Sequence, residues 1–426
     1  MSILDSVLME QISQITSHDP IAFRSNSQQL DEFLEGDYNS IAAELKAAFP
    51  SADNLPECYV PIVSRFAHEL ATLYRSPPFR EFKASSDVAG KLGAIYDSSL
   101  IDDEMNQVQR RLAVQRTMIV GVFPRDVRRY RVMHWAPWEC AVDPAEGADW
   151  KDIAQAREVH LRWPVRSDGG LVYYGRMVMT QSEIYLESEG KRLPVYGDSL
   201  ANPFGRIPLV ALRTNRPKKG RFFGPIAEDL LALEIGLAAG ESDIENILRH
   251  QAWAQKVISP GPDGVPPQMM VDDLPTGPDR VMIVPSAGGT YSAVNPNPAV
   301  DKYADNQERK IKLAAIMYDI SPTRFQKANT AQTGTARAAD REDREQSRAV
   351  FEPIFQRAER EMLQIIGAIS RLYRDPVPVP EDVDVRVRYS TWEPPADALR
   401  DSQADATTDQ TGETSPVDRV AQRYNI

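Results

Sequence analysis

The chain has 426 residues, of which 42% are hydrophobic and 26% charged, and a formal net charge of −12. This length is enough for two or three domains that bury a core without disulfides or metals. Apolar runs of eighteen residues are absent, and the first residues lack a basic stretch followed by an apolar core, so neither a membrane span nor a secretory signal is expected. The acidic balance argues against gripping nucleic acid by broad charge neutralisation, but not against letting it slide past.

Helical spacing dominates the first part of the chain. Four helices are expected, at 4–15, at 27–48, within 54–82 and from 102 to about 120. The Pro77–Pro78 pair ends the third of them, because proline removes a backbone donor and crowds the preceding turn.

Short strands are predicted from Arg129 to Leu212. Aromatic and β-branched residues alternate with polar ones between Gly, Pro and Asp breaks in the runs RYRVMHWAP, REVHLRWPV, GLVYYGRMVMT, SEIYLES and RIPLVALR. This pattern indicates a mainly antiparallel sheet.

The cysteines and strand histidines carry no recognisable metal pattern. Cys58 and Cys140 lie far apart without CxxC spacing, which favours reduced, buried thiols of a cytosolic product. His134 and His160 sit in strand-like runs, and their spacing to Cys140 matches no familiar zinc site. Packing is therefore the favoured role of both histidines.

Beyond the strands, a basic loop precedes two further helices. Lys218, Lys219 and Arg221 cluster in this loop and could touch phosphate, although such loops are more often solvated or paired with acids of a neighbouring chain. Helical spacing returns over 226–254 and 301–320. Between these helices the chain is rich in Pro and Gly and holds the strand-like pieces KVISP and RVMIVP, which predict a compact β-rich insertion.

The longest helical pattern follows the polar loop SPTRFQKANTAQTG. Its first half, from Thr335 to Val350, has few large apolar side chains and many opposite charges three and four residues apart, which is typical of a solvated or interface helix. Its second half draws an apolar stripe from Phe351 to Leu372. Pro353 predicts a kink between the halves. The run VDVRVRY then predicts a strand, and the acidic sequence beyond Pro395 looks flexible or docked through partners.

Enzyme signatures do not accompany these elements. The sequence has no GxxxxGK[ST] phosphate loop, GxGxxG, GxSxG or HExxH motif. With five histidines and no dense acid cluster, neither catalysis nor a cofactor is inferred.

Several segments, taken in order, resemble those of one family. NLPECYVPIVSRFAHELATLYRSPP resembles an early helix that ends at proline, and YRVMHWAPWECAVDP with REVHLRW resembles a pair of strands around a short acidic loop. SEIYL, NPFGRIPLVALR and PIAEDLLALEIGLAAGESDIENIL are similar to a strand, an FG-x-IP turn and a long helix. ISPTRFQKANTAQTGTARAADRE is similar to a loop and helix start that usually carries Ser-Gly, where this chain has Thr333–Gly334. The family is that of the portal proteins of long-tailed bacteriophages, and the resemblance is collinear over most of the chain.

This resemblance implies an α+β portal fold with a two-helix stem and a long kinked helix that runs towards a short crown. The implied parts are a wing at 1–225, stem helices at 226–254 and 302–319, a β-rich clip at 255–301, a tunnel loop at 320–334, the long helix at 335–373, and a wing strand with an acidic tail at 374–426.

The resemblance also implies a function without catalysis. Portals form rings, usually dodecamers, at one capsid vertex, where double-stranded DNA passes during packaging and ejection. The implied partners are further copies, the DNA, the terminase large subunit, the major capsid protein and head-tail adaptors. The implied location is the virion, and the host cytoplasm during assembly. A head-completion adaptor or scaffold is the alternative, and a metal-dependent packaging nuclease is a more distant one.

Two groups of candidate site residues follow. In the tunnel loop, Arg324 and Lys327 are the candidates for transient phosphate contact, and the alternative for both is a salt bridge to an adjacent subunit. Their uncharged neighbours are Asn329, Thr330, Gln332 and Thr333. The charge pattern at the start of the long helix gives the candidates for subunit contact, which are Arg337, Arg341, Glu342, Arg344, Glu345 and Arg348.

Overall fold

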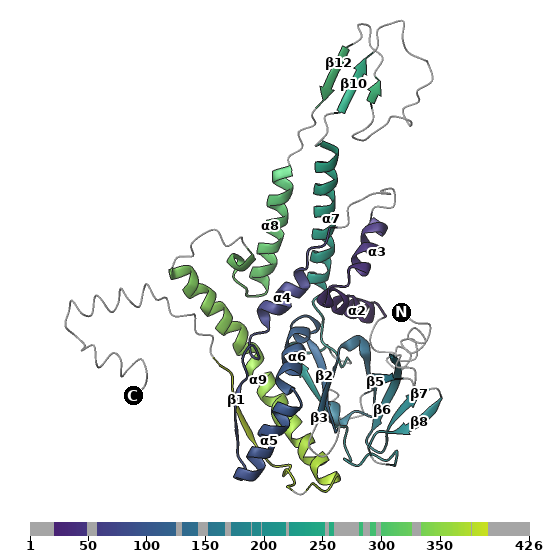
Figure 1. Cartoon of the computed structure of the whole chain (residues 1–426), viewed down its shortest axis with the longest axis vertical. Helices are drawn as coiled ribbons and strands as arrows, with labels where there is room; N and C mark the ends of the chain where they lie inside the picture. Colours follow the sequence, from purple (N-terminus) through teal and green to yellow (C-terminus); the bar gives the residue numbers. More distant parts are fainter. Residues whose placement is uncertain are drawn as a thin grey trace, which may run out of the picture.

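The computed structural model is an elongated α+β chain. Figure 1 shows a body of helices and sheets from which two helices rise to a small sheet at the far end. The described residues are 21–48, 58–124, 130–143, 152–166, 172–188, 190–196, 198–218, 221–251, 255–259, 281–283, 290–294, 300–325, 334–375 and 377–390. The expected helix at 4–15 and the acidic sequence beyond Pro395 lie outside them.

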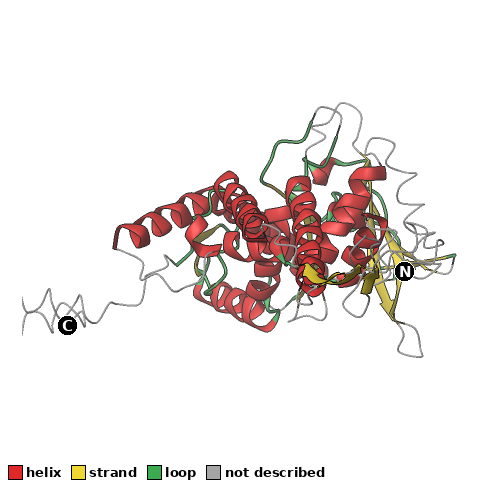
Figure 2. Cartoon of the chain, turned by 90° about the horizontal axis from the view of Figure 1, so that it is seen from above, coloured by secondary structure: helices red, strands yellow, loops and turns green. Residues whose placement is uncertain are grey.

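Helices make up the middle of the molecule, and the strands of the larger sheet lie to one side (Figure 2). The α-helices are α2 (Ile21–Glu35), α3 (Tyr38–Ala48), α4 (Ile62–Leu70), α5 (Ser86–Ser98), α6 (Ile101–Gln115), α7 (Glu228–Gln251), α8 (Val300–Met317) and α9 (Gly334–Leu372). Short 3-10 turns are η1 (Pro137–Glu139), η2 (Ile153–Gln155) and η4 (Pro322–Phe325).

Within the described residues, the strands form four small sheets. The first seven strands are β1 (Phe79–Phe82), β2 (Thr117–Pro124), β3 (Tyr130–Trp135), β4 (Cys140–Asp143), β5 (Glu158–Arg166), β6 (Val172–Thr180) and β7 (Ile184–Ser188). The others are β8 (Lys191–Pro194), β9 (Leu209–Arg213), β10 (Gln255–Ser259), β11 (Val281–Ile283), β12 (Thr290–Val294) and β13 (Val385–Arg388). Their orders are β3-β2-β9, β4-β5-β6-β7-β8, β11-β10-β12 and β1-β13.

The antiparallel pairing predicted for the strand region is confirmed, but it is divided between two sheets. The five-stranded sheet is antiparallel throughout, with Leu161 opposite Met177 and Val159 opposite Met179. The pairs β2–β3 and β2–β9 are also antiparallel. At the far end, β10 pairs antiparallel with β12 and parallel with β11.

Strand β2 separates two hydrophobic cores. Its alternate side chains Met118 and Val120 enter a core shared with the helices, whereas Ile119 and Phe123 enter a core shared with the five-stranded sheet. Gly121 permits close packing on β2, because a Cβ there would come within 2.7 Å of the Phe123 ring. The strand is therefore buried on both faces.

The predicted C-terminal ends of two helices, α6 and α4, are wrong. The helix expected up to about Val120 stops at Gln115, because Arg116 has a left-handed backbone (φ 60°) and a β-branched run follows. Helix α4 ends at Leu70, well before Pro77, and Gln109 of α6 contacts the freed backbone there. Its side-chain amide accepts from Leu73 N at 3.0 Å and donates to Leu70 O at 3.4 Å.

Helix α9 is continuous for 39 residues, as the sequence predicted, and it runs through Pro353. At about 1.5 Å per residue it spans roughly 58 Å. Its apolar stripe is buried against β2, β9 and β13. Strand β13, also predicted, pairs with β1 over Phe79–Phe82. The bend expected at Pro353 stays a prediction.

A buried ion pair fastens α9 to β1. Glu359 is fully buried, and Arg80 of β1 donates to it from Nε at 2.8 Å and from Nη2 at 2.7 Å. The hydroxyl of Tyr74 donates to the same carboxylate at 2.9 Å. Arg80 also reaches Asp102 at 2.5 Å. Three separate parts of the chain therefore meet at one buried carboxylate, and Asp102 joins them through Arg80.

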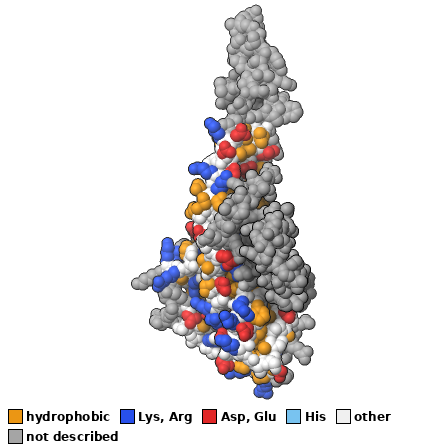
Figure 3. All heavy atoms as spheres, turned by 90° about the vertical axis from the view of Figure 1, so that its left-hand side faces the viewer, with side chains coloured by type: hydrophobic (Ala, Val, Ile, Leu, Met, Phe, Trp, Pro, Cys, Tyr) orange, Lys and Arg blue, Asp and Glu red, His pale blue; other side chains and the backbone are white. Residues whose placement is uncertain are grey.

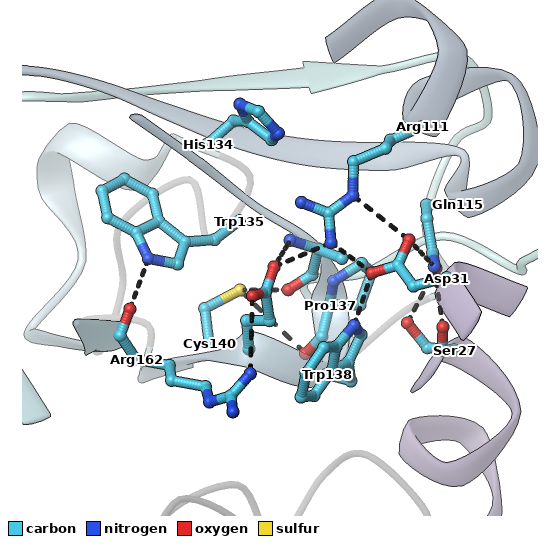
Figure 4. A network of polar contacts seen from close by, with 12 residues as sticks. Ser27, Asp31, Arg111, Gln115, His134, Trp135, Pro137, Trp138, Cys140 and Arg162 are labelled. Atoms are coloured by element: carbon cyan, nitrogen blue, oxygen red, sulfur yellow. Dashed lines mark hydrogen bonds and ion pairs between the residues drawn. The ribbon is translucent and has the colours of Figure 1, made fainter. Parts of the chain in front are cut away.

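A second polar network joins α2, α6 and η1 (Figure 4). Arg111 of α6 pairs with Asp31 of α2 and with Glu139 at 3.0 Å. Asp31 also accepts from the Trp138 indole at 2.5 Å and from the Gln115 amide at 3.0 Å. Because these hydrogen bonds and ion pairs join α2, α6 and η1, the network fixes the positions of α2 and α6 relative to η1.

The cysteines and strand histidines occupy packing positions. Cys140 is buried with its Sγ 3.1 Å from Ala136 O, and Cys58 is half-buried, both as free thiols. His160 is buried beside Glu158, and its pKa is lowered by burial. His134 lies 3.5 Å from Glu104. Across the described residues, no group of three or more His, Cys, Asp or Glu could hold a metal ion.

Candidate functional site

The helix pair α7–α8 stands out from the body and ends at the β10–β12 sheet (Figure 1). Helix α7 has 24 residues and α8 has 18, which correspond to roughly 36 and 27 Å. They pack on each other, and Gln307 of α8 lies against Gly240 of α7, where a Cβ would stand 1.5 Å from the Gln307 amide nitrogen. The absent side chain thus permits the close approach of the two helices.

Helix α8 is covered on one side only. Gln307 and Ala315 are its only buried residues. Its last two turns expose apolar side chains, with Leu313 50%, Ile316 60% and Met317 72% accessible. A contiguous exposed apolar surface of this kind marks a contact surface. We call Leu313, Ile316 and Met317 the α8 patch.

Charged residues precede the α8 patch along the helix. The exposed side of α8 also carries Lys302, Asp305, Glu308 and Arg309, and Lys312 pairs with Glu308 at 2.7 Å. Figure 3 shows hydrophobic and charged side chains mixed on the projecting part of the molecule. Protein–protein interfaces commonly combine an apolar centre with charged residues at the rim.

The short turn η4 connects α8 to the segment that precedes α9. Phe325 stacks on Phe66 of α4 with ring centroids 4.8 Å apart, and Tyr318 meets the same ring edge-on at 5.5 Å. Arg324 pairs with Glu69 of α4 at 3.2 Å, and both side chains are only 8% exposed. The root of the predicted tunnel loop is therefore packed on α4.

This placement corrects the prediction for Arg324. A cation in a polar loop was expected to face DNA or an adjacent subunit, but its guanidinium is buried in an ion pair within its own chain. Lys327, Asn329, Thr330, Gln332 and Thr333 lie outside the described residues, so their roles stay predictions.

The candidates for subunit contact are partly corrected as well. Arg348 is buried, where it donates to Tyr389 O at 3.2 Å and pairs with Glu345 at 3.4 Å, so it stabilises its own subunit. Glu345 is 43% exposed and keeps a side open to solvent. Arg337, Arg341, Glu342 and Arg344 lie on α9 as predicted, but only their backbone is described.

The basic loop before α7 is anchored by its aromatics. Phe222 and Phe223 are buried against each other, with centroids 5.1 Å apart, and the Arg213 guanidinium lies 4.2 Å from the Phe222 ring. Arg221 N donates to Lys218 O at 3.1 Å, which forms a turn. Lys218 is exposed, and Lys219 lies outside the described residues.

A cavity of about 560 Å³ opens beside the exposed face of α9. Its charged lining is Asp152, Arg213, Arg216, Arg357 and Glu361. Arg357 and Glu361 pair with each other at 2.7 Å. Thr214 supplies the hydroxyl of this lining, and its Oγ1 donates to Arg116 O at 3.4 Å.

A buried carboxylate on α7 escaped the sequence analysis. Glu234 is fully buried, and its Oε2 accepts from Val63 N of α4 at 2.6 Å. Burial raises the pKa of Glu234 to about 7, although the hydrogen bonds from Val63 and Tyr59 lower it. The only signal in the sequence is one acid on the apolar side of α7, between Leu230 and Leu237, and charges on that side of a helix are uncommon.

Comparisons with known proteins give matches in structure alone. No protein-family model matches the chain, and no curated protein matches its sequence. One similar solved structure is the virion of a native gene transfer agent particle, with 11% identity and a TM-score of 0.42, covering 88% of this chain and 90% of that one.

Two further structures come from the necks of such particles. The neck of the empty particle, computed with C6 symmetry, matches with 11% identity and a TM-score of 0.45, over 87% of this chain and 91% of that one. The neck of the native particle, computed with C12 symmetry, matches with 12% identity and a TM-score of 0.44, over 89% and 91%. At these identities and scores, none of the three matches establishes a function for this chain.

Within the described part of the chain, no helix combines the length and the apolar character needed to cross a membrane.

Proposed function

We propose that this chain is the subunit of a portal ring through which double-stranded DNA passes at one vertex of a phage capsid. The observation that carries the proposal is the α7–α8 pair, which projects from the body and leaves one side of α8 uncovered. The collinear sequence resemblance to long-tail phage portals supports the same assignment. In this reading α7 and α8 are the stem, β10–β12 the clip, and the sheets with α2–α6 most of the wing.

The α8 patch supports assembly into a ring. An exposed apolar patch on a monomer favours association with another protein. When identical copies bind head to tail, they close into a ring if the rotation from one copy to the next divides a full turn. Such a contact buries Leu313, Ile316 and Met317 against the next subunit. The resemblance implies twelve copies.

Residues 326–333 are the proposed DNA-facing loop. They begin directly after η4, whose position on α4 fixes one end of the segment. Because a moving duplex needs weak contacts that are blind to sequence, one cation beside uncharged polar residues suits the task better than a dense basic patch. Lys327 is the proposed phosphate contact, with Asn329, Thr330, Gln332 and Thr333 as uncharged neighbours.

The remaining roles follow from this architecture. The β10–β12 end is the proposed docking site for the terminase large subunit or a head-tail adaptor, and the outer body contacts the major capsid protein. The proposed location of the protein is the virion and, during assembly, the host cytoplasm. The proposal includes no enzymatic step and no cofactor.

The mass of the purified protein in solution tests the proposal. We expect native mass spectrometry to find a closed assembly at a large multiple of the 47.7 kDa subunit, about 570 kDa for twelve copies. A chain that stays monomeric across the concentrations measured would support a head-completion adaptor or scaffold instead.

A further inference from the structure

Helix α4 lies between the elements that the proposed function needs to coordinate. It has only nine residues, and six of them are buried: Ile62, Val63, Phe66, Ala67, Glu69 and Leu70. It packs against α2, α6 and α7, and Phe66 faces Phe325 of η4. At 1.5 Å per residue its ends are roughly 12 Å apart, so one short helix reaches both α7 and η4.

The first turn of α4 is bound to α7. The residue before the helix is Pro61, which has no side chain able to cap the first amides, and no side-chain cap forms there. Glu234 of α7 supplies the missing acceptor at 2.6 Å from Val63 N, although 171 residues separate the two. A carboxylate at a helix N-terminus also interacts favourably with the helix dipole. The start of α4 therefore follows the position of α7.

The last turns of α4 are bound to η4. Glu69 pairs with Arg324 at 3.2 Å, and both side chains are only 8% exposed, so loss of either one removes a buried charged contact between α4 and η4. The Phe66–Phe325 stack lies one turn earlier on the helix. Since 255 residues separate Glu69 and Arg324, this pair closes a long loop of the chain.

We propose that α4 is the positioning element that transmits the position of α7 to the root of residues 326–333. A displacement of α7, for example when a partner docks at the β10–β12 end, then reaches the loop through Glu234, α4 and the Glu69–Arg324 pair. This inference gives the portal function proposed above a route between its docking end and its DNA-facing loop, and it rests on that function for its purpose.

A second, direct connection between α7 and the end of α8 has to be distinguished from this route. The Tyr318 hydroxyl donates to Asp229 of α7 at 2.7 Å, one residue after α8 ends. The Tyr318→Phe variant removes this hydrogen bond and keeps the aromatic contact with Phe66. The route through α4 predicts that η4 stays protected in this variant.

Hydrogen exchange of the full-length protein tests the route. In Glu234→Leu, Val63 N loses its acceptor, and we expect exchange to rise about tenfold both in the first turn of α4 and in residues 320–325. Glu234→Gln keeps an acceptor and is expected to restore protection at both places. Exchange in the five-stranded sheet, which belongs to the other hydrophobic core, reports whether the fold is intact.

The reverse direction gives an independent reading if Glu234→Leu does not fold. Coupling is reciprocal, so Glu69→Gln is expected to raise exchange at Val63 as well as in residues 320–325. The matched control is Arg65→Gln, which removes the half-exposed partner of Glu69 at 3.0 Å and leaves the buried pair with Arg324. This control is expected to leave both regions unchanged.

The route through α4 would be overturned if each substitution raised hydrogen exchange only at its own end of α4. It would also be overturned if Tyr318→Phe alone raised exchange in η4. These readings are taken within one subunit and need neither DNA nor a ring. A protein that forms the ring but shows no coupling between the two ends of α4 would refute this inference and leave the portal proposal intact. A protein that shows the coupling but stays monomeric would support this inference and refute the portal proposal.

Discussion

Replacing Leu313 and Ile316 together by glutamate is expected to abolish assembly and leave the subunit folded. Both side chains are at least half exposed in the single chain, so the substitutions remove little from its core. In the proposed ring they lie in the contact between subunits, where two carboxylates per subunit would be buried without partners. We expect at least a hundredfold weaker association, measured by native mass spectrometry.

The control for this prediction is Leu193→Glu. Leu193 is an exposed apolar residue on β8, at the edge of the five-stranded sheet and away from α8. We expect it to leave both the assembly and the melting temperature unchanged. If the α8 variant assembles as the native chain does, the α8 patch is not the contact between subunits. If the α8 variant loses its melting transition, the patch belongs to the core instead.

The largest loss of stability is expected from Arg80→Met. Arg80 supplies two of the hydrogen bonds to the fully buried Glu359, and only the Tyr74 hydroxyl would remain among the partners described above. A buried carboxylate left without its cation destabilises a fold by about 3–5 kcal/mol. The free energy of unfolding, measured in urea, is expected to fall by about this amount.

An ion pair directly beside the same two strands provides the control. Lys83 and Asp384 also join the β1 and β13 region at 2.7 Å, but both are well exposed. Exposed pairs contribute less than about 1 kcal/mol, so Lys83→Met is expected to change little. The double variant Arg80→Met/Glu359→Met is expected to lose less than the sum of its single variants, because it leaves no buried charge. Equal effects of Arg80→Met and Lys83→Met would contradict this account.

The long and strongly patterned elements could be predicted from the sequence. Helix α9 and strands β5 and β6 have many residues that repeat the same apolar spacing, so the period identifies them. The strands β1, β4 and β8, each of four residues, are too short for a period to be visible, and they exist because distant strands pair with them. The first half of strand β2 was assigned to a helix, because the left-handed turn at Arg116 has no marker in the sequence.

The tertiary contacts of the candidate site could not be predicted. A charged residue in a polar segment is exposed in most proteins, which is why Arg324 was assigned to DNA contact and Arg348 to subunit contact. Their burial depends on Glu69 and on the backbone at Tyr389, both far away or unmarked in the sequence. The hydrogen bond from Val63 N to Glu234 likewise joins residues that are far apart in the sequence. Long-range pairs of this sort appear only when the chain is folded.

The central claim is that copies of this chain surround a channel, and electron microscopy of the purified, assembled protein in negative stain tests it most directly. We predict rings with a central stain-filled hole in end views, and in side views a wide body that narrows to the end formed by α7, α8 and β10–β12. Compact particles of single-subunit size without a hole would contradict the claim.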